Sequence, residues 1–135
     1  MRARLVLRYL WAAPASAVGL APAAVACAFG ATVRLRQDVL EVAGGGLAAL
    51  LRRAFPRLRF RAITFGHLVL GLSHGDLEEV RRHERVHVRQ YERWGILFFP
   101  LYLGSSAVQL LRGRHPYRQN VFERQAYAEE LSAAG

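Results

Sequence analysis

The sequence lacks lysine, contains one cysteine and has few acidic residues. All 19 basic residues are arginine, against 10 acidic residues, so the net charge is +9. The single cysteine, Cys27, excludes a disulfide within the chain and a zinc site built from several thiolates. The 135 residues fit one domain with a modest core. The arginines are spread along the chain without an aromatic-basic repeat, which favours a solvated surface or anionic lipid and predicts no nucleic-acid partner.

The N-terminal region is the longest stretch without charge. Residues 9 to 33 follow three arginines and are long enough to cross a bilayer, which takes about 20 helical residues. We favour a retained membrane anchor. A cleaved signal peptide is an alternative, because residues 26 to 28 have the small-x-small form. A further alternative is a pair of short helices, broken at Pro14 and Pro22 and packed on the rest. We therefore separate residues 1–31, an anchor or signal-like segment, from a domain over residues 32–135.

The middle of the chain contains strand-forming segments. Residues 32 to 44 alternate apolar and polar side chains around Gln37 and Asp38, which predicts a β-hairpin with one buried face. Residues 47 to 58 read as a short helix or a loop. Residues 60 to 71 are rich in β-forming residues and end at glycine, so we expect one strand there. The chain is therefore expected to have an α+β fold.

Two helices are expected in the second half. The first should begin near Asp76, which has capping-box spacing to Glu79, and should end at Gly95. Every fourth residue from Arg81 to Arg93 is arginine, and we expect this stripe to lie in solvent, with lipid contact as the alternative. The second helix should begin around Asn120.

The expected central helix carries the segment His83-Glu84-Arg85-Val86-His87. Histidines at i and i+4 on one helix face can bind one zinc ion, and the intervening glutamate can act as general base on a water molecule. A third protein ligand must come from elsewhere in the chain. The alternative interpretation is two surface histidines with ordinary Glu–Arg pairing.

These residues and the segment Asn120-Val121-Phe122-Glu123-Arg124-Gln125-Ala126 resemble the gluzincin class of zinc metallopeptidases, and most closely its small members, the minigluzincins. The resemblance covers about residues 60 to 130. It implies His83, His87 and Glu123 as Zn²⁺ ligands, Glu84 as general base, and a zincin-like domain in which a hairpin and an edge strand pack on the motif helix and a C-terminal helix. The sequence also resembles an uncharacterised bacterial family of small membrane-associated proteins.

The sequence departs from that pattern at Tyr127. Many gluzincins have an aspartate there, which orients a ligand histidine through its second ring nitrogen. Glu129, Glu130 or a backbone carbonyl would have to take its place. The alternatives to Glu123 as third ligand are His67, His74, His115, Glu129 and Glu130. His67, on the expected strand, is a candidate for contact with substrate or an oxyanion, and the alternative is a packed or exposed histidine.

The apolar residues 96 to 111 raise the question of a second membrane crossing. If His87 and Glu123 bind one metal ion, a crossing of about 30 Å between them is excluded. Residues 112 to 119 could not return through lipid, because their backbone groups would lack hydrogen-bond partners. We therefore expect a buried or interfacial helix, bent near Pro100 or Gly104, whose apolar surplus can lie on the bilayer.

The expected function is that of a membrane-associated, zinc-dependent metallopeptidase-like hydrolase acting on a peptide or protein. The alternative is a non-catalytic, zinc-binding module of the same fold at the membrane. A third hypothesis is a basic binder of membrane or nucleic acid without a metal ion.

Overall fold

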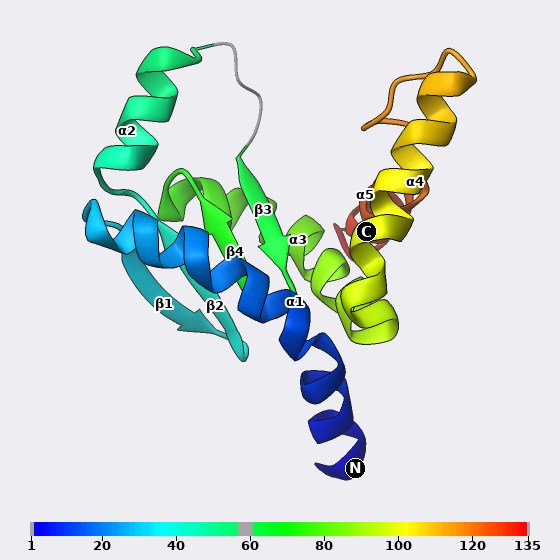
Figure 1. The fold of residues 1–135 in the computed structure, drawn as a ribbon, viewed down its shortest axis with the longest axis horizontal. Coiled ribbons are helices and arrows are strands. Elements are labelled where there is room, and N and C mark those ends of the chain that lie inside the picture. Colours follow the sequence, from blue (N-terminus) through cyan, green and yellow to red (C-terminus); the bar gives the residue numbers. More distant parts are fainter. Residues whose placement is uncertain (1, 57–60, 135) are drawn as a thin grey trace.

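The computed structural model describes residues 2–56 and 61–134 and has an α+β fold, as expected (Figure 1). Its elements in chain order are α1 (Arg2–Ala28), β1 (Thr32–Arg36), β2 (Val39–Ala43), α2 (Gly45–Ala54), β3 (Ala62–Phe65), β4 (Leu68–Gly71), α3 (His74–Trp94), the 3-10 turn η1 (Gly95–Leu97), α4 (Phe98–Leu111) and α5 (Val121–Ala134). The strands form one mixed sheet in the order β1-β2-β4-β3. β2 and β4 are parallel neighbours, and each also pairs with an antiparallel edge strand.

The hairpin expected over residues 32 to 44 is confirmed. β1 and β2 pair from Thr32 opposite Ala43 to Arg36 opposite Val39. The turn residues Gln37 and Asp38 both have positive φ, 49° and 63°. Tight hairpin turns need this conformation to match the twist of the strands.

The single strand expected over residues 60 to 71 is wrong, because the segment folds into a second hairpin. β3 and β4 pair antiparallel, with Phe65 opposite Leu68. Gly66, at φ 60°, takes the left-handed conformation that turns the chain. Phe60 lies outside the described residues. The apolar residues on both sides of the turn hid it in the sequence.

The sheet is covered on both faces. Val39 and Ala43 of β2 pack with Leu77 and Val88 of α3, whereas Val42 lies on the opposite face, in a cluster with residues of α1. Figure 1 shows α1 in front of the sheet and α3 behind it. The central strand β2 therefore has buried residues on both faces of the sheet.

The edge strand β1 departs from the expectation of one buried face. All five of its residues are exposed, including the apolar Val33 and Leu35. β2, by contrast, is buried at every position except Leu40. In this hairpin β2 therefore has buried residues on both faces, whereas β1 is exposed on both faces.

α1 is one continuous helix and is not broken into two at Pro14 and Pro22. Figure 1 shows its axis bending in the first half, as expected for a proline inside a helix. A stripe of small residues is buried against the domain: Ala12, Ala15, Gly19 and Ala23. A Cβ atom on Gly19 would lie 2.6 Å from Cβ of Phe65, so the helix approaches β3 as closely as glycine allows. The part of α1 from Ala12 on thus packs as a layer on the sheet, and α1 is also long and apolar enough to cross a membrane.

The start of α3 lies slightly before the expected position. Ser73 is the N-cap: its Oγ accepts a hydrogen bond from Asp76 N and donates one to Oδ2 of Asp76. The expected capping box of Asp76 and Glu79 is therefore replaced by a cap three residues earlier. The expected end is confirmed, since Gly95, at φ 59°, follows the last residue of α3.

The arginine stripe of α3 does not lie wholly in solvent. Arg81 makes two hydrogen bonds, of 3.0 and 2.9 Å, to the buried carboxylate of Glu41 on β2. Arg85 donates to the carbonyls of Arg36 and Gln37 in the β1–β2 turn. Burial alone would raise the pKa of Glu41, but the hydrogen bonds and charge of Arg81 lower it. Part of the stripe therefore joins α3 to the sheet.

Candidate metal centre

The candidate metal centre lies between α3 and α5. His83 and His87 are four residues apart on α3, so their side chains leave the same helix face one turn apart. Glu123 faces them from the first turn of α5. The start of α5 near Asn120 is confirmed, because Oδ1 of Asn120 accepts a hydrogen bond of 2.9 Å from Phe122 N. This cap places Glu123 opposite the two histidines.

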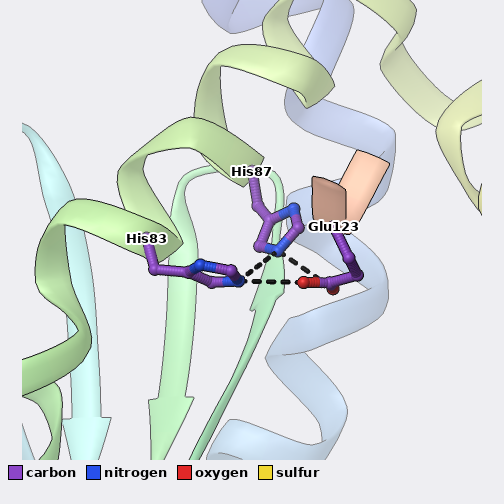
Figure 2. A group of neighbouring side chains, drawn as sticks. All are labelled: His83, His87 and Glu123. Atoms are coloured by element: carbon purple, nitrogen blue, oxygen red, sulfur yellow. Dashed lines mark hydrogen bonds and ion pairs between the residues drawn. The ribbon is translucent and has the colours of Figure 1, made fainter. Parts of the chain in front are cut away.

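The three side chains converge at one point (Figure 2). Nε2 of His83 is 3.3 Å from Nε2 of His87 and 2.9 Å from Oε2 of Glu123, and Nε2 of His87 is 3.1 Å from Oε1 of Glu123. Two ligands of a tetrahedral zinc ion, each about 2.1 Å from it, are about 3.4 Å apart. The donor atoms therefore have nearly the spacing that zinc requires, and two imidazoles with one carboxylate are a suitable ligand set.

The second ring nitrogens of the histidines face acceptors. Nδ1 of His87 lies 2.8 Å from Oε1 of Gln90, and Nδ1 of His83 lies 3.3 Å from Oε2 of Glu130. An acceptor at Nδ1 holds one proton there, so that when Nε2 loses the proton it can share with Glu123, its lone pair is available to a metal ion. Of the residues expected to substitute for an aspartate at the position of Tyr127, Glu130 is the one beside a ring nitrogen of His83.

Gln90 and Tyr102 extend this support to α5. The Gln90 side-chain nitrogen donates to the carbonyl of Phe122 and to Oε1 of Gln125, which fixes its amide with the oxygen toward His87. The Tyr102 hydroxyl on α4 donates to Oε1 of Glu123 at 2.8 Å. The ligands are therefore held by side chains from three helices.

The centre is buried and electrostatically coupled. The exposed fractions are 5% for His83, 6% for His87 and 3% for Glu123. Burial acts to raise the pKa of Glu123, but hydrogen bonds from His83 and His87 lower that pKa to about 2. Burial acts to lower the pKa of His87, and the hydrogen bond and charge of Glu123 raise it overall. Glu123 is therefore an anion at neutral pH, as a metal ligand must be.

Glu84 is held by the neighbouring strand. Thr64 of β3 donates a hydrogen bond of 2.6 Å to Oε2 of Glu84, and both side chains are buried. The Tyr91 hydroxyl donates to the carbonyl of Thr64, which fixes that residue in turn. Oε1 of Glu84 accepts no hydrogen bond within the described part of the chain, so one oxygen remains for proton transfer.

The histidine proposed as a substrate or oxyanion contact lies away from this centre. His67 is in the β3–β4 turn, stacked on Tyr9 at 4.1 Å and 2.9 Å from the Glu92 carboxylate. Glu92 is five residues after His87, about 140° away around α3. His67 therefore contacts another side of the helix, and the structure does not place it with the three converging residues.

The remaining candidates for a third ligand have partners of their own. His74 is hydrogen-bonded to Thr32, and Nδ1 of His115 accepts backbone hydrogen bonds within its own loop. Glu129 pairs with Arg89. Glu130 approaches His83 from its Nδ1 side. Among the candidate third ligands, only Glu123 faces both Nε2 atoms.

Sequence reasoning missed Gln90, Tyr102 and Thr64. Gln90 stands three residues after His87, a spacing that places it near His87 on the same helix surface, so it could have been found. Tyr102 and Thr64 belong to other elements, and no local pattern marks them. Tyr127, the departure from the gluzincin pattern, packs its ring 4.3 Å from that of His83.

Comparisons with known proteins found no matching family model, no similar curated protein and no similar solved structure. The chemistry of the centre therefore has to be argued from its own residues.

We expect one zinc ion per chain, and we expect Glu123→Ala to weaken zinc binding at least as strongly as His87→Ala. Each variant removes one of three converging donors, so the loss should exceed the roughly 10- to 100-fold typical of an outer-shell partner. Competition with a chromogenic chelator measures the affinity. His67→Ala and Glu129→Ala are the controls, and parent-like affinity in Glu123→Ala would contradict the assignment.

We expect Gln90→Ala to lower zinc affinity by roughly 10- to 100-fold, because His87 loses the acceptor that keeps its proton on Nδ1. The same chelator competition measures the effect. The control is Gln125→Ala, which removes one hydrogen bond to Gln90 but leaves Gln90 bonded to the Phe122 carbonyl and its Oε1 beside His87. Equal affinities of the two variants would show that Gln90 only joins the helices.

Proposed function

We propose that this protein is a zinc-dependent metallopeptidase-like hydrolase associated with a membrane. The observation that carries the proposal is the convergence of buried His83, His87 and Glu123. Glu84 occupies the general-base position of the motif, and its charge acts to raise the pKa of His87. A carboxylate fixed beside a metal site is what hydrolysis of a peptide bond requires.

The gluzincin resemblance supports the same proposal. The helix with the two histidines, the later helix with the glutamate and the neighbouring edge strand β3 agree with a zincin-like domain. The resemblance rests on the motif residues of this chain alone, since no related protein was found.

In the proposed mechanism, His83, His87 and Glu123 would hold the zinc ion. Bound there, zinc would supply Lewis-acid polarisation of the scissile carbonyl and lower the pKa of the attacking water. Glu84 accepts the proton of that water on its free oxygen and delivers it to the leaving amine. Thr64 keeps the Glu84 carboxylate in place, and Glu130 and Gln90 keep the histidine protons on Nδ1.

The burial of the ligands favours one alternative, a non-catalytic zinc-binding module. No ligand is more than 6% exposed, and structural zinc sites are closed. On the His83 side the centre is bordered by Tyr127 and Glu130, of which Tyr127 is exposed and Glu130 partly exposed.

Membrane association is supported by α1. It is long and apolar enough to cross a bilayer, and its side facing away from the domain carries large exposed apolar residues. Arginines flank its start, as is common for retained anchors. We propose that α1 contacts the membrane while its small residues pack on the sheet.

We expect Glu84→Gln to lose peptide hydrolysis by about 10²- to 10⁴-fold, the usual contribution of general base catalysis, with zinc content unchanged. The zinc-loaded protein and variant are compared on a fluorogenic peptide library. Glu78→Gln, an exposed carboxylate on the same helix, is the control. Absence of zinc-dependent cleavage by the parent protein would favour the non-catalytic alternative.

We expect the full-length protein to sediment with membranes after a high-salt wash, because apolar side chains of α1 remain exposed in the fold. Leu7→Glu/Leu10→Glu should shift it toward the soluble fraction. Leu35→Glu/Leu50→Glu is a matched control, since all four leucines are between 60% and 66% exposed. Equal behaviour of the two double variants would exclude α1 as the anchor.

A further inference from the structure

Beyond its first turn, which buries Phe98 in the core, α4 has its polar side chains toward the protein and its apolar side chains outward. From Tyr102 on, the inward side consists of Tyr102, Ser105, Ser106 and Gln109. The outward side carries five exposed residues: Leu101, Leu103, Val108, Leu110 and Leu111. A surface helix in water has the opposite arrangement. Helices that face lipid turn their polar groups inward in this way.

Hydrogen bonds fix α4 in this rotation. Ser105 Oγ accepts from Val121 N at 3.0 Å, and Ser106 Oγ donates to the carbonyl of Pro116 at 3.0 Å. Asn120, which caps α5, donates to Ser106 Oγ and to the carbonyl of Tyr102. Turning the apolar side inward would break these bonds and the one from Tyr102 to Glu123, so the outward leucines remain uncovered.

The charges around this face have one sign. Residues 93 to 122 contain no aspartate or glutamate. Arg112, Arg114 and Arg118 follow α4 and are exposed. Figure 1 shows α4 projecting from the rest of the fold with this loop at its far end. An apolar strip bordered by arginines is complementary to a bilayer with anionic headgroups, where each arginine near the surface contributes about a fivefold increase in affinity.

We propose that the outward side of α4, together with the arginines of residues 112–118, binds the surface of an anionic phospholipid bilayer. The helix lies in the plane of the interface. Its 14 residues extend about 21 Å, less than the roughly 30 Å of a hydrocarbon core, and the irregular loop after it cannot enter lipid. This contact is separate from α1.

The position of α4 relates this surface to the metal centre. Tyr102, on the inward side of α4, is hydrogen-bonded to Glu123. The centre therefore lies one helix diameter from the proposed membrane surface, about 10 Å. The identity of the substrate rests on the proposed hydrolase function, whereas the membrane contact does not. If that function holds, the substrate is a polypeptide segment close to the membrane.

The test places a fluorescent probe on the outward side of α4 in the full chain. A Cys27→Ser background removes the native thiol, and Leu103→Cys is labelled with an environment-sensitive dye. The protein is reconstituted into vesicles of phosphatidylcholine and phosphatidylglycerol carrying nitroxide on the lipid acyl chains. Leu50→Cys on α2 is the matched control, because Leu103 is 67% exposed and Leu50 is 60% exposed.

We expect a blue-shifted probe at position 103 that is quenched several-fold more than the probe at position 50. Similar quenching at both positions would overturn the proposal. A second result would also overturn it. If the probe at position 103 is blue-shifted but not quenched by lipid nitroxide, and the blue shift disappears on dilution into excess lipid, a second copy of the chain covers α4. No zinc or activity is measured, so failure here differs from failure of the hydrolase proposal.

A second variant tests the headgroup contact. Arg112→Gln/Arg114→Gln should reduce quenching at position 103 on phosphatidylglycerol vesicles toward the value on pure phosphatidylcholine. Arg34→Gln/Arg53→Gln removes the same charge elsewhere and should leave the quenching unchanged. Equal loss in the two double variants would show general attraction of a basic protein and would overturn the arginine contact.

Discussion

The hydrogen bonding of the buried Glu123 carboxylate is the interaction on which the second half of the structure depends. A carboxylate at 3% exposure is costly unless it is paired, and removing one partner of a buried ion pair typically costs about 3–5 kcal/mol. Here three groups lie within hydrogen-bond distance of it: Nε2 of His83 and Nε2 of His87 from α3, and the Tyr102 hydroxyl from α4. The same negative charge that makes Glu123 costly to bury suits it to bind a divalent cation.

This requirement explains the unusual orientation of α4. Tyr102 of that helix donates a hydrogen bond to Glu123. Ser105 and Ser106 accept hydrogen bonds from the start of α5, which positions Glu123. The polar side of α4 is therefore committed to the interior, and the leucines must point outward. The metal centre and the exposed apolar surface have a common origin in the packing of α4 against α5.

Local sequence patterns predicted the elements whose causes are local. The β1–β2 hairpin followed from its alternation and turn residues, the end of α3 from Gly95, and the start of α5 from Asn120. The residues that converge were named from the motif and its resemblance, because spacing on one helix fixes two of them.

The remaining features depend on contacts between distant segments. The single strand expected over residues 60 to 71 hid a turn, since Gly66 stands among strand-forming residues on both sides. The arginine stripe looked solvated until β2 placed Glu41 beneath it. Tyr102 contacts Glu123 across 20 intervening residues, and no periodic pattern signals such a contact. Tertiary packing decided each of these cases.

The small-residue stripe of α1 has a consequence for proteolytic processing. The helix covers the face of the sheet that carries Val42, Leu68 and Phe65. Cleavage near residue 28 would remove this cover and leave apolar strand residues in water, where uncovered sheet surface promotes aggregation. The N-terminal helix thus shields this apolar face of the sheet from water.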